Sequence, residues 1–354
     1  MAQRIRWGIL GTGGIAAEFA RALQWVPEAK LEIVASRTLD RAKEFAAAHG
    51  AARAVGGRDE LARAGGVDVI YVATPNASHK ADAIALLEVG HAVVCEKPFT
   101  TSAAEAREVA DVARRKGVFC MEAMWMHFAP VMRDLRSLVS AGEIGDVKMV
   151  VAQLGFPFAP GNRIFDRGPG GGVLLDLGVY PVSFAVRLLG RPKRVVANAV
   201  FGSEGVDEQV AAVLEFEEGK QAIIGASARS RTANDATVLG TEGMIQVNEP
   251  MYCPESISVT PSSVIGHGGG GTSSGGRLAR LKDSAIAQDV RSILRRAKTR
   301  TIRRRLLGKG YAHEIAEVVR CLQAGERECA LMTLDESIVV AETLDEIRRA
   351  YGSA

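Results

Sequence analysis

The sequence predicts an α/β protein in two parts: a doubly wound parallel sheet, followed by an α+β part with a large, mostly antiparallel open sheet. Three observations support this prediction. Apolar runs alternate with helical segments over the first third of the 354 residues. A glycine-rich turn follows the first apolar run. From Val147 onward, pairs of apolar strands joined by short glycine-containing connections replace that alternation.

The first part alternates strands and helices in a regular order. After the N-terminal strand, further strands are expected at residues 31–35, 67–73, 92–95 and 118–121. The third and fourth of these five strands are near-continuous apolar runs, typical of strands buried on both faces. Thr38 is the expected N-cap of the helix after the second strand. Ser102 and Glu105 have the spacing of a capping box ahead of a helix that ends near Lys116.

The second part contains paired strands. They are expected at residues 210–216, 221–226, 236–239 and 244–247. Gly219 and Gly243 lie in the short connections and suit hairpins. We therefore place the boundary between the two parts after residue 121, so that residues 122–354 form the α+β part.

Composition excludes several classes of protein. A net charge of +3 is too small for a general nucleic-acid binder. The 5 cysteines show neither a Cys-x-x-Cys pair nor a zinc-like spacing, which indicates a reducing compartment and no structural metal. The chain enters a strand at once, leaving no room for a signal peptide, and no apolar run reaches the roughly 20 residues needed to cross a bilayer. We expect a soluble cytoplasmic protein.

The first strand turns through glycines into a helix with the pattern Gly-x-Gly-x-x-Ala. Gly11 permits the tight turn, Gly13 lets the backbone approach a pyrophosphate, and Ala16 keeps helix and strand close. The other residues of the loop are Thr12, Gly14 and Ile15. The N–H groups at the helix start face an anion. The pattern predicts a Rossmann dinucleotide-binding domain over residues 1–121; a tight glycine turn without a ligand is the alternative.

The end of the second strand indicates which dinucleotide is bound. NAD-selective folds place a carboxylate there to accept hydrogen bonds from the ribose 2′-hydroxyl. This chain has Ser36 and Arg37 instead, with Arg41 one helical turn later. A hydroxyl and two guanidinium groups suit a 2′-phosphate, which favours NADP over NAD. Two ordinary solvated arginines are the alternative.

Glu96, Lys97 and Pro98 follow a buried strand at the edge where open α/β sheets bind ligands. A lysine there directs its ammonium into the cleft, where it polarises a hydroxyl or carbonyl and stabilises alkoxide charge. A cis bond before Pro98 would fix the direction of that lysine. A surface turn is the alternative.

Four motifs together resemble the Gfo/Idh/MocA oxidoreductase family. They are the glycine turn, Ala73-Thr74-Pro75-Asn76 with His79, Glu96-Lys97-Pro98, and Asp176-x-Gly178-x-Tyr180. The resemblance covers nearly the whole chain apart from residues 262–310. The segments 122–125 and 170–181 further resemble the branch of dimeric dihydrodiol dehydrogenases and NADP-dependent D-xylose dehydrogenases, where Tyr180 replaces the histidine of many family members.

The resemblance implies hydride transfer between nicotinamide and a carbon that bears a hydroxyl, or the anomeric carbon of an aldose. Tyr180 would be the general acid/base, and Lys97 would lower the pKa of its phenol. Asp176 would bind a substrate hydroxyl or orient Lys97, with a buried helix-capping aspartate as the alternative. A homodimer through the open face of the second sheet is implied as well.

Further residues carry over from the family. The turn expected to contact the cofactor comprises Thr74, Pro75, Asn76 and His79. The aromatic residues expected to wall the substrate pocket are Trp125, Phe156, Phe158 and Phe165, with plain core packing as the alternative. His127 is counted with the pocket and stands where close relatives commonly have arginine.

Residues 262–310 depart from the family pattern. Residues 266–276 have the composition of a flexible linker. A helix-compatible basic run follows, with no acidic residue from Arg291 to Lys309. We expect a solvated, partly mobile insertion that is dispensable for chemistry. Attraction to anionic lipid or to a polyanion is the alternative.

These observations predict an NADP-dependent dehydrogenase that acts on the CH–OH group of a sugar, such as the aldose D-xylose, or of a trans-dihydrodiol. One alternative is a sugar ketone or imine reductase, because hydride transfer is reversible. Another is a non-catalytic NADP-binding regulator. The presence of both Lys97 and Tyr180 speaks against it.

Overall fold

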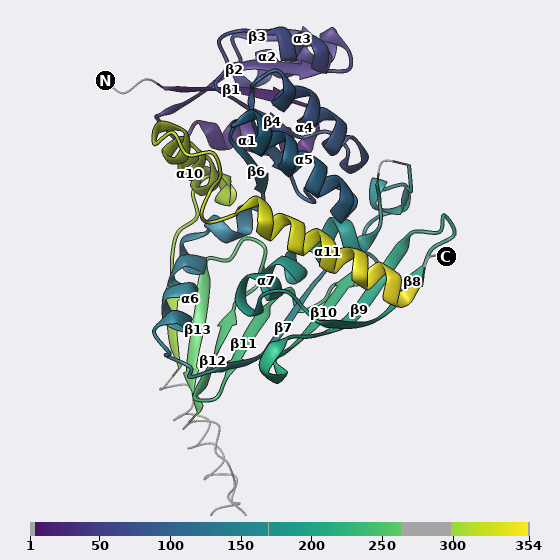
Figure 1. Cartoon of the computed structure of the whole chain (residues 1–354), viewed down its shortest axis with the longest axis vertical. Helices are drawn as coiled ribbons and strands as arrows, with labels where there is room; N and C mark the ends of the chain where they lie inside the picture. The colour runs from purple at the N-terminus through teal and green to yellow at the C-terminus, as the bar shows by residue number, and fades with distance from the viewer. Residues whose placement is uncertain (1–3, 169, 263–298, 353–354) are drawn as a thin grey trace, which may run out of the picture.

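The computed structural model describes residues 4–168, 170–262 and 299–352, which form two sheets with the helices around and between them (Figure 1). The first sheet has 6 parallel strands in the order β3-β2-β1-β4-β5-β6. The strands are β1 (Ile5–Leu10), β2 (Ala29–Ser36), β3 (Arg53–Gly56), β4 (Val69–Val72), β5 (Ala92–Glu96) and β6 (Cys120–Ala123). This is the strand order of a Rossmann sheet, so the predicted doubly wound fold is confirmed.

Helices cover both faces of this sheet. They are α1 (Gly14–Leu23), α2 (Leu39–His49), α3 (Arg58–Arg63), α4 (His79–Glu88) and α5 (Ala103–Lys116). The Ser102 hydroxyl accepts the Glu105 N–H at 3.4 Å, as the capping-box spacing predicts, and Gly117 ends α5 in the left-handed region. Thr38 occupies the N-cap position of α2, but its side chain makes no capping hydrogen bond. The sequence did not indicate β3 or α3, because both are short and polar.

The second sheet has 8 strands in the order β14-β13-β12-β11-β7-β10-β9-β8. The strands are β7 (Val147–Gly155), β8 (Arg194–Phe201), β9 (Asp207–Glu215), β10 (Gln221–Ser227), β11 (Ala236–Gly240), β12 (Gly243–Val247), β13 (Ser256–Pro261) and β14 (Arg300–Arg303). Among the described strands of this second sheet, only the β7–β10 pair is parallel, so the predicted mostly antiparallel sheet is confirmed.

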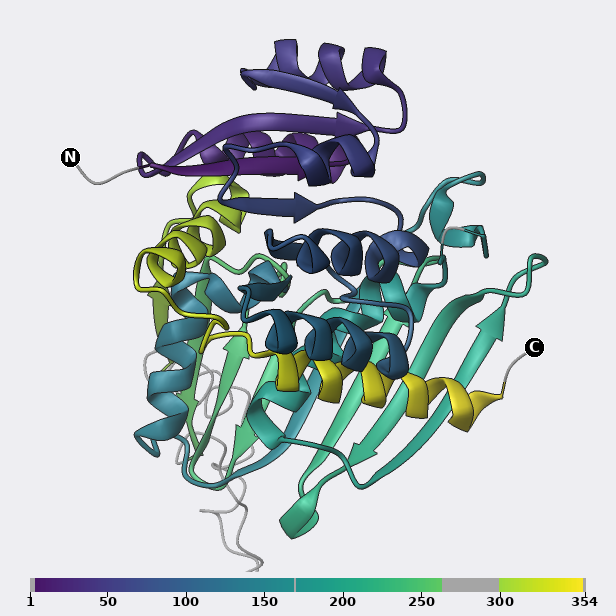
Figure 2. The same cartoon turned by 45° about the horizontal axis from the view of Figure 1, so that its top comes forward.

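One face of the second sheet is covered and the other is open. The helices of this part are α6 (Pro130–Ser140), α7 (Val179–Leu189), α10 (Tyr311–Gln323) and α11 (Leu334–Tyr351). Figures 1 and 2 show α11 running across the strands β8 to β10 and beside α5, and it packs on α5, α7 and β8. The opposite face exposes Val196, Val200, Val213 and Ile223. None of the described helices combines the length and apolar character needed to cross a membrane.

The expected insertion is partly wrong. Residues 300–303 do not continue a basic helix but form β14, which pairs with β13 and sets Ile302 opposite Ile257. Acidic side chains of α6 and of the turn after it neutralise this edge, because Arg300 and Arg304 each lie 2.9 Å from a carboxylate, of Glu143 and Asp134 respectively. The glycine-rich segment and the basic residues up to 298 lie outside the described residues.

Candidate active site

A cavity of about 1310 Å³ opens along the carboxyl ends of β1, β2, β4 and β5 and continues toward the second sheet. Cavities at this edge are where doubly wound sheets bind their ligands. The predicted site residues that line it are Gly11, Thr12, Gly13, Gly14, Ile15, Ser36, Arg37, Arg41, Thr74, Pro75, Asn76, His79, Glu96, Lys97, Trp125, Phe156, Asp176 and Tyr180. The topology therefore gathers these residues from seven separate segments of the chain.

The glycine turn has the geometry of a phosphate cradle. Gly11 has a φ of +117°, and a Cβ there would lie 2.4 Å from the carbonyl oxygen of Ala73. Gly13 and Gly14 have no atom within 4 Å of an added Cβ, so the space beside them is open. Helix α1 starts after Gly13 without a side-chain cap, which leaves its first N–H groups for an anion. The turn therefore fits a dinucleotide pyrophosphate.

The rim beside β2 carries positive charge. The Ser36 hydroxyl lies 3.1 Å from the hydroxyl of Thr12, and Arg37 and Arg41 line the same end of the cavity. Arg58, which sequence reasoning missed, joins them from the start of α3 and lies 3.4 Å from an Asp82 carboxylate oxygen. No local pattern marked this residue, because β3, the short strand that brings it to this edge of the sheet, was not predicted.

His79 joins two loops at the floor of the cavity. Its ring nitrogens lie 2.8 Å from the Pro98 carbonyl and 2.9 Å from the Thr74 carbonyl. Burial lowers the pKa of this imidazole. The Lys97–Pro98 peptide is cis, as expected, although Pro98 does not itself line the cavity. The Asn76 side-chain amide connects this loop to the second part of the molecule, because it donates a hydrogen bond to the Gly170 carbonyl at 2.9 Å.

Lys97 connects β5 to the π-helical turn Leu174–Gly178 that leads into α7. Its Nζ donates to the Asp176 carbonyl at 2.9 Å and lies 3.9 Å from an Asp176 carboxylate oxygen. That carboxylate also accepts a 2.6 Å hydrogen bond from Arg163. Burial alone would raise the pKa of Asp176, but the two cations outweigh it and lower the pKa. Asp176 is therefore ionised and held in place.

Tyr180 is buried at the start of α7, and its hydroxyl accepts the Trp125 indole N–H at 2.8 Å. The expected lowering of its pKa by Lys97 is wrong for this arrangement. Burial, together with the nearby Glu96 carboxylate, raises the pKa of Tyr180 well above its ordinary value. The Lys97 ammonium lies over the face of the ring, 4.8 Å from its centroid, rather than at the hydroxyl. The phenol is therefore neutral at pH 7.

Glu96 lies buried between these groups. One carboxylate oxygen accepts the hydroxyl of Tyr71, and the other accepts the Lys97 backbone N–H at 3.1 Å. Burial raises the pKa of Glu96, and the charge of Lys97 opposes that rise. Tyr71 stacks on Phe19 with ring centroids 3.6 Å apart, which fixes its hydroxyl beneath Glu96.

Aromatic rings wall the far end of the cavity. Trp125 stacks on Tyr311 with centroids 4.5 Å apart, and Tyr252 meets both Trp125 and Phe156 edge-on at 5.7 and 6.0 Å. Tyr252 and Tyr311 were missed, because Tyr252 lies in a connection between strands and Tyr311 begins a distant helix. No sequence pattern distinguishes either tyrosine, as a residue of the cavity wall, from an ordinary surface or core residue.

Three residues predicted for the pocket lie away from it. His127 is buried behind Trp125 and pairs with the Ser183 hydroxyl at 2.8 Å. Phe158 packs edge-on against Phe156, and Phe165 lies 4.6 Å from the Arg229 guanidinium. None of the three is among the residues that line the cavity. Their contacts are those of packing residues.

The segment after β14 reaches the cavity, although it belongs to the insertion that the sequence predicts to be dispensable for chemistry. Leu306 and Lys309 both line it. Lys309 lies between Gly308 and Gly310, all three with positive φ, and a Cβ on Gly308 would lie 2.9 Å from Ala22 of α1. The Lys309 ammonium lies 2.9 Å from the Glu18 carboxylate on α1. This contact brings a cation from the second part beside the glycine turn.

A phosphate cradle that shares one cavity with a buried lysine–tyrosine pair places the molecule in the class of nucleotide-binding oxidoreductases. A family model described as "Oxidoreductase family, NAD-binding Rossmann fold" matches residues 5–124, and one described as "GFO/IDH/MocA C-terminal domain" matches residues 132–246. The chain belongs to the Gfo/Idh/MocA oxidoreductase family.

Curated relatives and solved structures agree with this family. Trans-1,2-dihydrobenzene-1,2-diol dehydrogenases of Sus scrofa and Homo sapiens are 34% and 32% identical over 98% of this chain and 97% of theirs. A 3-ketoreductase from Actinomadura kijaniata, solved with NADP and TDP-benzene, has a TM-score of 0.80 and 24% identity over 98% of both chains. An aldose–aldose oxidoreductase from Caulobacter crescentus, solved with glycerol, has a TM-score of 0.79 and 20% identity over 99% of this chain and 98% of its own.

Proposed function

We propose that the protein is an NADP-dependent oxidoreductase that acts on the CH–OH group of a neutral sugar or a trans-dihydrodiol. Residues 1–121 would bind the nucleotide, and residues 122–354 the substrate. The observation that carries the proposal is the position of Lys97, Tyr180 and Asp176. They meet where the cavity passes from the carboxyl edge of the first sheet to the aromatic wall.

NADP is supported as the cofactor by the rim beside β2. A hydroxyl and three guanidinium groups, from Ser36, Arg37, Arg41 and Arg58, line the cavity there, with no carboxylate at the end of β2. The 3-ketoreductase that shares this fold was solved with NADP. The glycine turn would hold the pyrophosphate, and the bound cofactor supplies or accepts the hydride.

Tyr180 would move the proton that accompanies the hydride. Its neutral phenol donates a proton to the substrate oxygen in the reductive direction, and in the oxidative direction its phenolate takes the proton from the substrate hydroxyl. The Lys97 ammonium offers positive charge to an oxygen that becomes alkoxide-like. The ionised Asp176 carboxylate accepts a hydrogen bond from a second substrate hydroxyl, while Arg163 keeps it in place.

The lining of the far end suits a ring with vicinal hydroxyls. The faces and edges of Trp125, Phe156 and Tyr252 offer an apolar wall, and Asp176 faces it with a carboxylate. The relatives with about a third of residues identical are named for a trans-dihydrodiol, and a structural neighbour for an aldose. The neutral phenol also favours a second candidate, reduction of a sugar ketone or imine, which needs a proton donor. A non-catalytic regulator would have no use for the Lys97–Tyr180 pair.

We also propose a homodimer through the open face of the second sheet. Val196, Val213 and Ile223 are exposed and lie opposite one another on β8, β9 and β10, and Val151 of β7 continues the row. A row of apolar side chains across four strands calls for a partner surface. A second copy offers an identical row related by a two-fold axis. All five cysteines are unpaired thiols, which supports a cytoplasmic location.

A substrate screen tests the enzymatic proposal. The absorbance of reduced nicotinamide is followed with NADP and a panel of aldoses and trans-dihydrodiols, and with NADPH and the matching ketones and imines. We expect turnover with at least one member of the first panel. Turnover confined to the second panel would assign the reductase, and binding of NADP without turnover of either panel would assign the regulator.

A further inference from the structure

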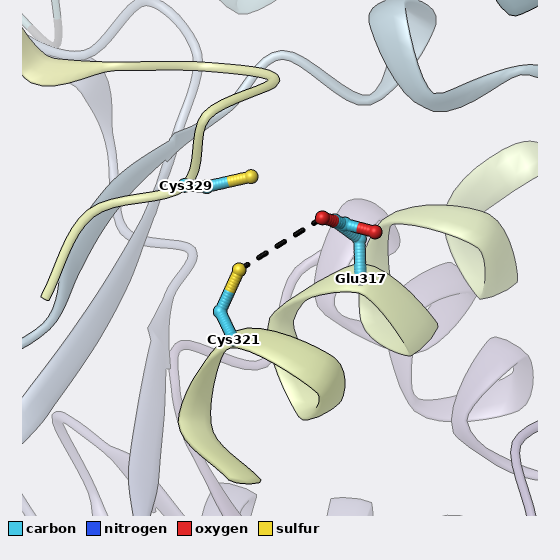
Figure 3. Close-up of side chains that lie close together, drawn as sticks. All are labelled: Glu317, Cys321 and Cys329. Atoms are coloured by element: carbon cyan, nitrogen blue, oxygen red, sulfur yellow. Dashed lines mark hydrogen bonds between the residues drawn. The ribbon is translucent and has the colours of Figure 1, made fainter. Parts of the chain in front are cut away.

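Two cysteines and a glutamate meet between α10 and the segment that leads to α11 (Figure 3). Cys321 lies in the last turns of α10, Glu317 lies one turn earlier, and Cys329 follows the turn after the helix. The two sulfur atoms and a Glu317 carboxylate oxygen all lie within 4.8 Å of one another. None of the three residues lines the active-site cavity, so the proposed function does not use this cluster.

A guanidinium group keeps the cluster electrostatically suited to a thiolate. Arg320 lies with Nη2 3.2 Å from the Cys321 sulfur and pairs with Glu317 at 2.8 Å and with Glu326 at 2.7 Å. A hydrogen bond from the Cys321 thiol lowers the pKa of Cys329. The lowered pKa favours the thiolate of Cys329, which is the form that reacts with oxidants.

The cluster is buried but close to the surface. Both cysteines are fully covered, yet the side chains of Arg320 and Glu326, which pair beside them, are 48% and 36% exposed. Ion pairs of exposed side chains are weak, so a small solute reaches the sulfurs when these side chains move. Cys253 is the half-buried thiol in this part of the chain, and burial raises its pKa to about 11, which keeps it protonated and slow to react.

The arrangement favours oxidation over metal binding. The Glu317 carboxylate is already engaged by Arg320, and a guanidinium beside the sulfurs opposes the approach of a divalent cation. A tetrahedral zinc site would also need a fourth ligand, and among the described residues the cluster offers three.

We propose that Cys321 and Cys329 are a redox-active pair that closes reversibly to a disulfide when the protein meets hydrogen peroxide. The thiolate first takes an oxygen atom as the O–O bond breaks, which gives a sulfenic acid and a hydroxide ion that takes a proton from solvent and leaves as water. The second thiol then displaces the hydroxyl group, so the S–S bond forms and a second water leaves. The two cysteines lose two electrons and one proton, solvent supplies the second proton, and hydrogen peroxide is reduced to two molecules of water.

The disulfide would connect α10 covalently to the segment around Cys329, which makes hydrogen bonds with both parts of the molecule. The Arg327 carbonyl accepts the Cys120 N–H of β6 at 3.2 Å, and the Leu331 carbonyl accepts a hydrogen bond from Arg187 of α7. The opposite end of α10 carries Tyr311, which stacks on Trp125 in the aromatic wall. Oxidation would therefore fix the C-terminal end of the helix whose first residue, Tyr311, contributes to the aromatic wall of the cavity.

Peptide mapping of the full-length protein tests the proposal. The reduced protein is exposed to hydrogen peroxide, its free thiols are blocked with N-ethylmaleimide, and the trypsin digest is weighed by mass spectrometry. Arg327 lies between the two cysteines, so trypsin separates them unless a disulfide joins their peptides. We expect a joined Cys321–Cys329 peptide, two hydrogen atoms lighter than the sum of its parts, before Cys253 is oxidised. Dithiothreitol should restore the separate peptides.

Variants and a metal titration separate the outcomes. Cys329→Ser should abolish the joined peptide, Cys253→Ser should leave it, and Arg320→Gln should slow its formation several-fold because the thiolate loses its cation. Separate, unmodified Cys321 and Cys329 peptides in wild-type protein at a peroxide dose that oxidises Cys253 would overturn the proposal. Binding of one Zn²⁺ per chain that blocks oxidation until a chelator is added would overturn it in favour of a metal site.

Discussion

The ammonium of Lys97 lies over the ring of Tyr180 and gives its hydrogen bond to a backbone carbonyl, not to the phenol. The phenol is held by Trp125 instead. The two residues are therefore separable in role: the hydroxyl of Tyr180 carries the proton, and the charge of Lys97 acts through space on the ring and on the bound oxygen. Their joint presence in one cavity is the feature on which the proposed chemistry depends.

Tyr180→Phe should lower kcat roughly 100-fold to 10,000-fold, because the general acid/base is lost while the ring packing stays. The dissociation constant for NADP, measured by fluorescence titration, should not change. Near-native turnover of this variant, once circular dichroism shows it folded, would remove Tyr180 from the mechanism.

Lys97→Met serves as the companion variant in the same experiment. It should cut kcat as well, because the substrate oxygen that becomes alkoxide-like loses the nearby positive charge. The double variant should lose little more than the worse single one, since the residues act as a unit. Strictly additive losses would mean that they act independently.

Arg37→Ala should raise the KM for NADP about tenfold or more and leave the KM for NAD nearly unchanged, because a charge-assisted contact to the 2′-phosphate is lost. Steady-state kinetics with both cofactors measures this. Lys43→Ala is the matched control, since it removes a positive charge from α2 at a residue that does not line the cavity. Equal effects of Arg37→Ala on both cofactors would contradict the NADP assignment.

Lys309→Ala should weaken NADP binding several-fold at low salt, with a smaller effect at high salt, because a cation is removed from beside the glycine turn. Lys309→Arg keeps the charge and should bind NADP normally. Isothermal titration at two ionic strengths reports both. If Lys309→Ala bound NADP as tightly as the wild-type protein, Lys309 would have no role in cofactor binding, and its ion pair with Glu18 would serve only to connect the two parts.

The sequence was sufficient where chemistry depends on a local pattern. The turn at Gly11 and Gly13 needs its glycines in sequence, and Lys97 follows a strand whose end defines the ligand edge. Lys309 and Tyr252 contribute through contacts between distant segments, and no local pattern marks such contacts. His127 was misjudged for the same reason: an aromatic-rich stretch near the cavity has one side facing it and one side facing away, and only the packing against Ser183 decides which.

Glu122→Gln should flatten the pH dependence of stability. Glu122 is buried on β6 and accepts the Phe99 N–H at 3.0 Å, and burial raises its pKa from 4.5 to about 7. The folded state therefore binds this proton more tightly than the unfolded state, so wild-type stability should fall as pH rises from about 4.5 to about 7, by roughly 1–3 kcal/mol from this group. Urea unfolding at pH 5 and 7.5 compares both proteins. Identical slopes with pH would show that Glu122 does not titrate in this range.

Val213→Lys should convert the proposed dimer to a monomer, because it places a charge in the centre of the apolar row across β8, β9 and β10. Sedimentation velocity measures the mass. Leu39→Lys is the control, since Leu39 is an equally exposed apolar residue on α2, away from the second sheet. A wild-type monomer, or a dimer that survives Val213→Lys, would refute this interface.

Helix α11 contacts both parts of the molecule. It follows both parts in the sequence, yet it lies against α5 of the nucleotide part and against α7 and β8 of the substrate part (Figure 2). The sides of α5 and α7 that it covers can therefore be buried only after residues 334–351 have been synthesised. In the folded protein the same helix ties the two parts together, so any change in their relative orientation would have to break its contacts with α5 or with α7 and β8.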